Sequence, residues 1–380
     1  MDAKAGARER FEGVRSGLIE LSHRIHAHPE LGFEEEKASA WLCERLSETG
    51  FAVEKGICDL PTAFRARAGS GPLHVAFCAE YDSLPGIGHA CGHNIIAAAS
   101  IGAAISAAQV ADEVGLTVSV IGTPAEEVGN ASGKILLLER GAFAGIDAAM
   151  MVHPAPIDMC TAKIIAASMF DVHCTGKASH ASAFPELGIN AADALTVAQT
   201  AIGLLRQHIR DTDRIHGIVT HGGDAPNVVP ARTSARYIIR SETLEQLAEL
   251  RTRVHRCFHA GALATGAKVD IVGGDKPYAE MRHDARMAEL YRRNAERLGR
   301  KFPDPGVWEN RPTASTDMGN VSLAVPSIHP MIGINSLPAV NHQPEFAAHC
   351  ASPDADQALA DGAVAMAWTC IDLAELSGGS

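Results

Sequence analysis

The hydrophobic and polar positions of the first 165 residues follow two alternating patterns: short apolar runs, and longer segments with the period of a helix. Helices are predicted at residues 7–26, 35–49, 92–109 and 132–140, and strands at residues 73–78, 116–121 and 148–152. Strands that alternate with helices favour an α/β fold with a mostly parallel sheet flanked by helices. Ligands of such sheets bind beyond the carboxyl ends of the strands.

The pattern changes after about residue 164. From there strands are predicted at residues 169–174, 217–221, 234–240 and 268–272, and helices at residues 190–206 and 245–263. The order strand, helix, strand, strand, helix, strand is that of a ferredoxin-like α+β unit. We therefore expect residues 166–278 to form an inserted second domain. Residues 1–165 and 279–380 then form the main domain, which resumes with a helix at residues 285–298.

Composition and charge restrict the class of protein. Of the 380 residues, 46% are apolar and 21% charged, as in ordinary globular chains, and no apolar run approaches the ~20 residues that cross a bilayer. The net charge of −12 argues against nucleic acid or an anionic membrane as a partner. The nine cysteines are scattered without a C-x-x-C pair, and the charged N-terminus lacks an apolar signal segment. A reduced, cytoplasmic protein is therefore expected.

Side chains that can bind a metal follow each predicted strand of the main sheet. They are Glu80, Asp82, Cys91, His93, Glu126, Glu127 and His153. A lone histidine or cysteine is more often structural than a ligand, but clusters at consecutive strand ends favour one shared site. Cysteine and histidine suit zinc, and histidine with carboxylates also suits manganese or cobalt. Cys91 in addition precedes a predicted helix N-terminus, where the helix dipole favours a thiolate.

Glu126 and Glu127 are the most informative pair in the sequence. Adjacent carboxylates in an apolar setting repel each other, so either a cation is bound or one carboxyl group is protonated. We predict that Glu127 binds metal and that Glu126 is the general base toward a metal-activated water. Asp82 is expected to assist catalysis by orienting a metal ligand.

A further donor, His342, lies in the segment NHQPEF at residues 341–346. The candidate metal ligands are then five, namely Cys91, His93, Glu127, His153 and His342. One zinc ion takes about four ligands, so five protein donors and a bridging water fit two ions better than one. The sequence thus predicts two divalent ions per subunit, Zn²⁺, Mn²⁺ or Co²⁺.

Five motifs, spread from about residue 26 to residue 346, together resemble those of a known enzyme family. They are HAHPELGF at 26–33, EYDSLPGIGHACGHN at 80–94, GTPAEE at 122–127, GKASHA at 176–181 and NVVP at 227–230. The sequence resembles the dinuclear metallopeptidases and amidohydrolases. This family includes aminoacylases, hippurate hydrolase, carboxypeptidase G, plant indole-acetyl-amino-acid hydrolases and p-aminobenzoyl-glutamate hydrolase.

The resemblance implies the same five metal ligands and Glu126 as the base. It also implies that the inserted domain is a lid through which the chain forms a homodimer. His180 would then reach the partner's active site and stabilise the developing oxyanion. Asn227 and Arg240 would hold a substrate carboxylate, for which a guanidinium fork is well suited.

One departure from the family pattern points to a subgroup. Asn94 stands where many amidohydrolase members have aspartate, and it occurs together with GIG at 86–88 and STDMGNVS at 315–322. This combination resembles the branch that contains p-aminobenzoyl-glutamate hydrolase and dipeptidases for substrates of the β-alanyl-lysine type. Asp317 would then contact the substrate.

The leading hypothesis is metal-dependent hydrolysis of an amide bond in a small N-acyl amino acid or dipeptide-like substrate with a free carboxylate. A thiol hydrolase with Cys91 as nucleophile and His93 as base is an alternative. Residues two positions apart are poorly placed for that attack, and the Glu126–Glu127 pair would be unexplained. A non-catalytic metal-binding scaffold, and hydrolysis of another C–N bond in an aryl amine or carbamoyl group, are further alternatives.

Overall fold

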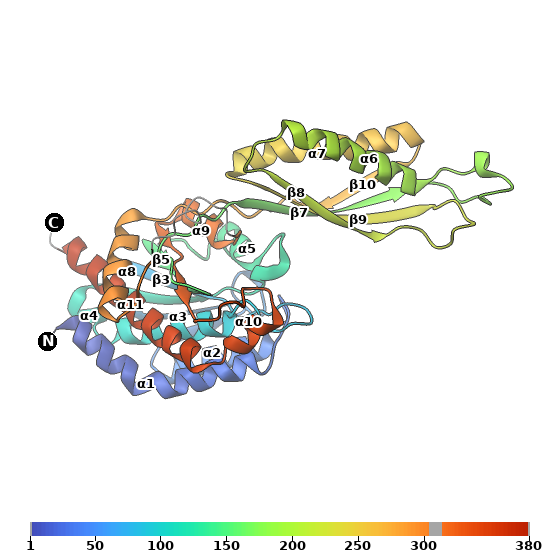
Figure 1. Ribbon diagram of the computed structural model, residues 1–380. Helices are drawn as coiled ribbons and strands as arrows, with labels where there is room; N and C mark the ends of the chain where they lie inside the picture. Colours follow the sequence, from blue (N-terminus) through green and yellow to red (C-terminus); the bar gives the residue numbers. More distant parts are fainter. Residues whose placement is uncertain (1, 304–313, 379–380) are drawn as a thin grey trace.

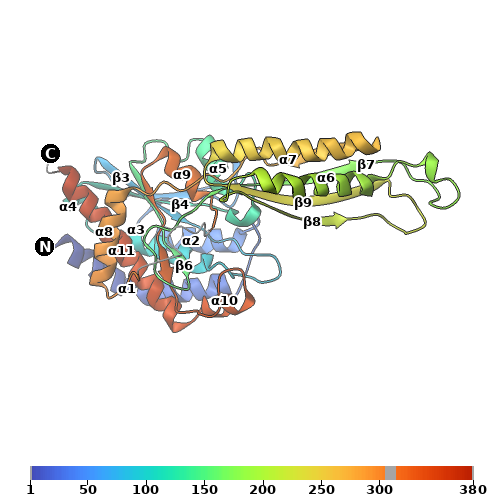
Figure 2. The same cartoon turned by 45° about the horizontal axis from the view of Figure 1, so that its top comes forward.

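The structure is a computed structural model that describes residues 2–303 and 314–378. A six-stranded sheet organises the main body, and a four-stranded sheet organises a second unit that projects from one side of it (Figure 1). Both chain termini lie on the opposite side of the main body from this projecting unit (Figures 1 and 2). No helix of the described residues is long and apolar enough to cross a membrane.

The main sheet is mostly parallel, as the sequence predicts. Its strand order is β1(Ala52–Lys55), β2(Phe64–Gly69), β4(Leu116–Gly122), β3(Leu73–Ala79), β5(Ala148–Met150) and β11(Ser327–Ile328). The pairs β3–β4, β3–β5 and β5–β11 are parallel, whereas β1 and β2 form an antiparallel edge. The short and partly exposed β1 and β2 are not predicted from the sequence, because their apolar pattern is weak.

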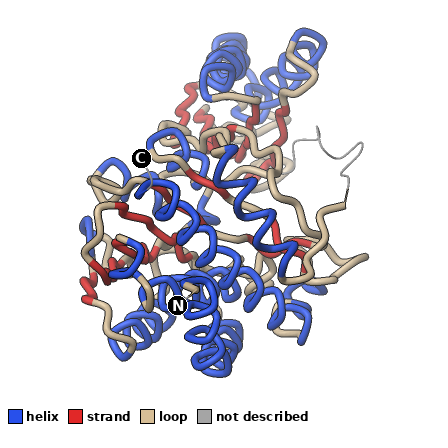
Figure 3. Tube along the Cα trace, turned by 90° about the vertical axis from the view of Figure 1, so that its left-hand side faces the viewer, coloured by secondary structure: helices blue, strands red, loops and turns tan. Residues whose placement is uncertain are grey.

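Helices cover both faces of this sheet (Figure 3). On one face lie α1(Ala3–His26), α3(His93–Ala108), α8(Ala285–Arg297) and α11(Pro353–Gly378). The other face packs against α5(Gly133–Glu139) and α9(Met318–Ala324). Successive side chains of a strand point to opposite faces of the sheet. Val75 and Phe77 of β3 therefore belong to the core on the first face, and Ala76 and Cys78 to the core on the second.

Shorter elements complete the main body. They are α2(Glu36–Glu48), α4(Ala111–Val114), α10(Pro344–His349), and the parallel pair β6(His153–Ala155) and β12(Met331–Gly333). A 3₁₀ turn, η2(Glu126–Val128), follows β4. Buried strands therefore lead directly into the segments that carry the candidate site residues.

The projecting unit has the predicted ferredoxin-like order. It consists of β7(Ala166–Thr175), α6(Ala191–Leu205), β8(Arg214–His221), β9(Arg232–Ser241), α7(Leu244–Thr265) and β10(Lys268–Gly273). The sheet order is β10-β7-β9-β8, with every neighbouring pair antiparallel. Both helices cover one face of this sheet (Figures 1 and 2), around an aromatic core that contains Phe170, Tyr237 and Phe258. The domain limits at 165/166 and 278/279 stay a prediction.

Candidate metal centre and active site

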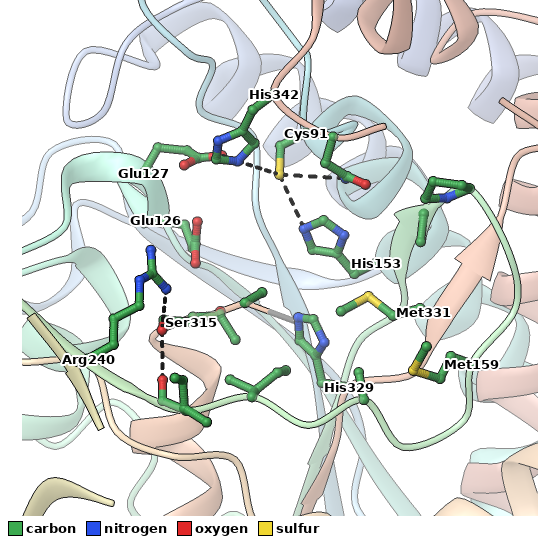
Figure 4. Close-up of a pocket in the computed structure, with 18 of the residues that line it drawn as sticks. Cys91, Glu126, Glu127, His153, Met159, Arg240, Ser315, His329, Met331 and His342 are labelled. Carbon is green, nitrogen blue, oxygen red and sulfur yellow. Dashed lines mark hydrogen bonds and ion pairs between the residues drawn. The ribbon is translucent and has the colours of Figure 1, made fainter. Parts of the chain in front are cut away.

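The five predicted metal ligands lie together at the carboxyl edge of the main sheet. Figure 4 shows four of them, Cys91, Glu127, His153 and His342. They come from the loop and first turn of α3, from η2, from β6 and from the segment before α10. Their ligand atoms form two groups that share Cys91, and the atoms of each group all lie within 4.8 Å of one another. One group contains Cys91, His93 and His153, and the other contains Cys91, Glu127 and His342. Two groups that share a thiol could hold two neighbouring ions.

The distances between donor atoms fit tetrahedral coordination. Cys91 Sγ lies 3.5 Å from His153 Nε2 and 3.6 Å from His342 Nε2, and His342 Nε2 lies 3.5 Å from Glu127 Oε1. Sulfur and nitrogen bound to one zinc at normal bond lengths are about 3.6 Å apart. His93 Nε2 and Glu127 Oε1 are also buried without a hydrogen-bond partner among the described residues. The residues present therefore fit divalent metal ions.

The backbone around Cys91 explains how the donors approach so closely. Gly92 has φ +77°, and a Cβ at this position would lie 2.8 Å from Cγ of Pro154, the residue after His153. The backbone amide of His342 donates to the carbonyl of Ala90 at 2.9 Å, which ties the C-terminal ligand to the same loop. Glycine is thus needed where the loop turns against the β6 ligand.

The helix N-terminus alone does not make Cys91 a thiolate. Burial, and then the Glu127 carboxylate, hold the pKa of Cys91 well above its ordinary value. A thiolate at this position therefore requires a cation beside it. A buried thiol with a raised pKa is also a poor nucleophile, which weakens the thiol-hydrolase alternative.

Asp82 connects two of the ligands with its two carboxylate oxygens. Oδ1 lies 2.7 Å from His93 Nδ1, and Oδ2 accepts a hydrogen bond from the backbone amide of Glu127 at 2.9 Å. The first contact leaves His93 Nε2 facing the other donors. This is the geometry that the predicted orienting role of Asp82 requires.

Two side chains, those of Glu35 and Tyr278, form three hydrogen bonds with the backbone of the turn that carries Glu126. Ala125 has φ +57°, a left-handed conformation, and its amide donates to Glu35 Oε1 at 2.8 Å. The hydroxyl of Tyr278 donates to the carbonyl of Glu126 and accepts from the amide of Gly129. Neither Glu35 nor Tyr278 is singled out by the sequence as a site residue. For Glu35 the available signal is its place directly after the motif at residues 26–33.

Glu126 itself is almost fully buried and lines the cavity. Burial raises its pKa well above the ordinary value, and the carboxylates of Glu80, Glu127 and Asp317 raise it further. A carboxyl group with a raised pKa holds a proton more firmly than one in water. That property suits a group that must accept a proton and pass it on.

The buried carboxyl group of Glu35 predicts a pH-dependent stability. Burial, then Asp82, raises its pKa from 4.5 to about 7. Between these values the unfolded chain releases the proton first, so Glu35 should contribute a fall of about 3 kcal/mol in the free energy of unfolding as the pH rises. Urea unfolding of the metal-free protein at pH 4.5 and pH 7.5 measures this fall. Glu35→Gln should abolish most of it, whereas Glu34→Gln, at an exposed position, should not. An unchanged pH slope in Glu35→Gln would contradict the prediction.

Four of the predicted ligands, Cys91, Glu127, His153 and His342, border a cavity of about 720 Å³. Its walls include the polar residues Glu126, Arg240 and His329 and apolar side chains such as Met159 and Met331 (Figure 4). Nη1 of Arg240 donates to Ser315 Oγ at 2.7 Å, and no carboxylate of the described residues forms an ion pair with this guanidinium. A half-buried, unpaired guanidinium in a cavity is suited to an anionic group of a ligand.

Two predicted residues lie far from this cavity. His180 and Asn227 are exposed on the projecting unit, where the Ala181 amide donates to the carbonyl of Asn227 at 3.0 Å. His180 Nδ1 accepts a hydrogen bond from the amide of Ala183 at 3.1 Å. Neither side chain lines the cavity of its own subunit.

The predicted substrate contact of Asp317 does not fit the structure. Asp317 is 0% exposed, and its oxygens accept from Ser132 Oγ at 2.7 Å, Lys134 N at 3.0 Å and Lys134 Nζ at 2.6 Å. Its neighbours Ser315 and Thr316 line the cavity instead. Burial raises the pKa of Asp317, but three donors aimed at its oxygens favour the carboxylate. Asp317 is therefore part of the buried support of the site.

Asn94 also supports the site from a buried position, away from the cavity. It is fully buried, and its Nδ2 donates to Ser22 Oγ and to the carbonyl of Cys350, both at 2.9 Å. The residue that suggests a subgroup in the sequence thus connects α1, α3 and the segment after α10. Lys134 and His329, by contrast, are site residues that the sequence does not reveal, because an isolated lysine or histidine has no distinguishing pattern.

Comparisons with known proteins agree with this geometry. Residues 166–265 match the family of the peptidase dimerisation domain. The Xaa-Arg dipeptidase of Mus musculus is 38% identical over 97% of this chain and 88% of its own length. One of the chains of the p-aminobenzoyl-glutamate hydrolase of Escherichia coli is 32% identical over 68% of this chain and 58% of its own length.

Solved structures show the same fold. A dinuclear metal-binding peptidase of the M20 family from Bacillus subtilis has a TM-score of 0.69 at 21% identity, with 96% of this chain and 99% of that chain covered. The aminobenzoyl-glutamate utilization protein from Klebsiella pneumoniae has a TM-score of 0.72 at 17% identity, with 95% and 97% covered. The fold and the donor set define a metal-dependent hydrolase. More specifically, the chain belongs to the M20 family of metallopeptidases and amidohydrolases.

Proposed function

We propose that this protein hydrolyses the amide bond of N-acyl amino acids or dipeptides that carry a free carboxylate. The observation that carries the proposal is the guanidinium of Arg240, which forms no ion pair with a carboxylate of the described residues and shares its cavity with Glu126 and with ligands of both groups. A carboxylate bound to Arg240 places the neighbouring amide inside this cavity. The names of the relatives, a dipeptidase and a p-aminobenzoyl-glutamate hydrolase, agree with such a substrate.

In this proposal two divalent ions would be held by Cys91 together with His93 and His153, and by Cys91 together with Glu127 and His342. Bound divalent ions supply a Lewis acid for the carbonyl oxygen and lower the pKa of water. The donor set suits Zn²⁺, Mn²⁺ or Co²⁺. Asp82 keeps the imidazole of His93 in the orientation that presents Nε2.

Glu126 is the proposed general base. Its carboxylate accepts a proton from the attacking water and returns this proton to the nitrogen of the leaving amine. Glu35 and Tyr278 fix the backbone on either side of Glu126. The side chain therefore keeps its place in the cavity through both proton transfers.

A hydrolysis screen tests the proposed function. The protein is treated with chelator, reloaded separately with Zn²⁺, Mn²⁺ or Co²⁺, and assayed for release of the amine. Acyl-glutamates, acyl-aromatic amino acids and β-alanyl dipeptides are compared with the same compounds amidated at the carboxylate. We expect metal-dependent hydrolysis of the free acids and at least about tenfold lower kcat/KM for the amidated forms. No hydrolysis of any free acid by the reloaded protein would contradict the proposal.

The proposal also includes a homodimer formed through residues 166–278, in which His180 acts in the partner's cavity. Its support is the match to a dimerisation domain and the exposure of His180 away from its own cavity. A cytoplasmic location is proposed as well, since all nine cysteines are free thiols, which persist in reducing compartments.

Active sites shared between subunits predict complementation. Glu126→Gln and His180→Ala homodimers should each lose about 100-fold or more of the activity. A heterodimer of the two, purified with two different tags, contains one cavity with both Glu126 and His180 intact. We expect roughly half of the wild-type activity per dimer. A heterodimer as inactive as the two homodimers would show that His180 does not act across the interface.

A further inference from the structure

A second charged cluster lies directly behind the metal ligands. Glu80, Lys134 and Asp317 are each 0% exposed. The ammonium of Lys134 lies 2.5 Å from Glu80 Oε1 and 2.6 Å from Asp317 Oδ1. The other oxygen of Glu80 lies 3.4 Å from His93 Nε2 and has no hydrogen-bond partner among the described residues. The cluster therefore contacts the metal centre through Glu80.

Three carboxylates of this region are spaced as metal ligands are. Oxygen atoms of Glu80, Glu126 and Asp317 lie within 4.8 Å of one another. Three carboxylates so close in a buried setting repel strongly unless a cation lies between them. Lys134 provides that cation from within the chain, because its Nζ touches two of the three.

The electrostatics of the cluster agree with a permanent internal cation. Burial by itself would lower the pKa of Lys134, but Asp317 and Glu80 raise it above the ordinary value. Lys134 is also fixed by its backbone, since its amide donates to Asp317 Oδ2 at 3.0 Å at the start of α5.

We propose that the ammonium of Lys134 occupies a third cation site, formed by Glu80, Asp317 and Glu126, next to the metal centre. Lys134 thereby prevents a further divalent ion from binding and holds Glu80 in place behind His93. In this role Lys134 is a positioning residue, because it acts on the metal centre through Glu80 and does not line the cavity.

Two substitutions separate the charge of Lys134 from its shape. Lys134→Ala removes the ammonium and opens its space, so three carboxylates face an empty pocket. Lys134→Met removes the charge but fills the space with a side chain of similar length. Each variant is stripped with chelator, reloaded with Mn²⁺, passed through a desalting column and analysed for manganese by mass spectrometry. The wild type is treated in the same way.

We expect Lys134→Ala to bind one more Mn²⁺ per subunit than the wild type. Its unfolding temperature should also rise more on addition of Mn²⁺ than that of the wild type. Lys134→Met should bind no more Mn²⁺ than the wild type and should unfold at a lower temperature. Equal manganese content in Lys134→Ala and the wild type would overturn the proposal, whatever the activity of either protein.

A double variant keeps the test decisive if Lys134→Ala is too unstable to purify. Lys134→Ala/Asp317→Asn has one carboxylate fewer and should fold better than Lys134→Ala, with no extra Mn²⁺. This result supports the proposal, because it shows that repulsion between the carboxylates is what destabilises Lys134→Ala. If the double variant is as unstable as Lys134→Ala, Lys134 serves only to fill space and the proposal is wrong.

Discussion

Glu126→Gln is expected to lower kcat by about 10²–10⁴-fold while the protein keeps its metal content and fold. The amide has the shape of the carboxyl group but cannot accept the proton of the attacking water. KM should change little, because Arg240 and the ligand groups are untouched. Steady-state kinetics with a substrate from the screen, together with metal analysis of the same sample, measures both quantities.

The neighbouring residue provides the matched control. Glu127→Gln removes a proposed ligand one position away, so it should reduce the metal content as well as the activity. If Glu126→Gln retained near-normal turnover with its metal bound, Glu126 would not be the base. If Glu127→Gln bound metal as firmly as the wild type, the assignment of roles within the pair would be wrong.

Cys91→Ala is expected to have the largest effect on the metal centre. Cys91 belongs to both ligand groups, so its loss should weaken both ions and reduce hydrolysis to background. Removal of His153 or His342 affects only one group. Metal analysis and isothermal titration with Zn²⁺ measure the loss of binding directly.

Cys350 offers a matched control for this substitution. It is a buried thiol whose Sγ would lie 3.3 Å from a Cβ at Gly92, yet it belongs to neither ligand group. Cys350→Ala should therefore keep metal and activity. A Cys91→Ala protein that loses activity but binds a full complement of metal would favour the thiol-hydrolase alternative.

Much of the site could be predicted because it follows from the order of the chain. Buried strands that run parallel bring their carboxyl ends to one edge, so Cys91, Glu127 and His153 had to lie near one another. The adjacent pair Glu126 and Glu127 also predicts a bound cation or a protonated carboxyl group from the sequence alone. His342 is a candidate donor by residue type alone, and the family resemblance gives it greater weight, because its segment has no periodic pattern.

Other features depend on contacts that no local pattern contains. Lys134 has no distinguishing pattern in the sequence, and only the fold places it between Glu80 and Asp317. The resemblance places Asp317 at the substrate, and its neighbours do line the cavity, but its own side chain points into that buried cluster. The last helix, α11, is buried on nearly all sides, so its apolar residues show no amphipathic period.

We propose that Cys91 would contact both ions, and anomalous diffraction from crystals of the zinc-loaded protein tests this central proposal most directly. An anomalous difference map at the zinc absorption edge should contain two peaks per subunit, each about 2.3 Å from Cys91 Sγ. One peak should lie beside His93 and His153, and the other beside Glu127 and His342. A single peak, or two peaks of which either lies beyond bonding distance of Cys91, would contradict the account.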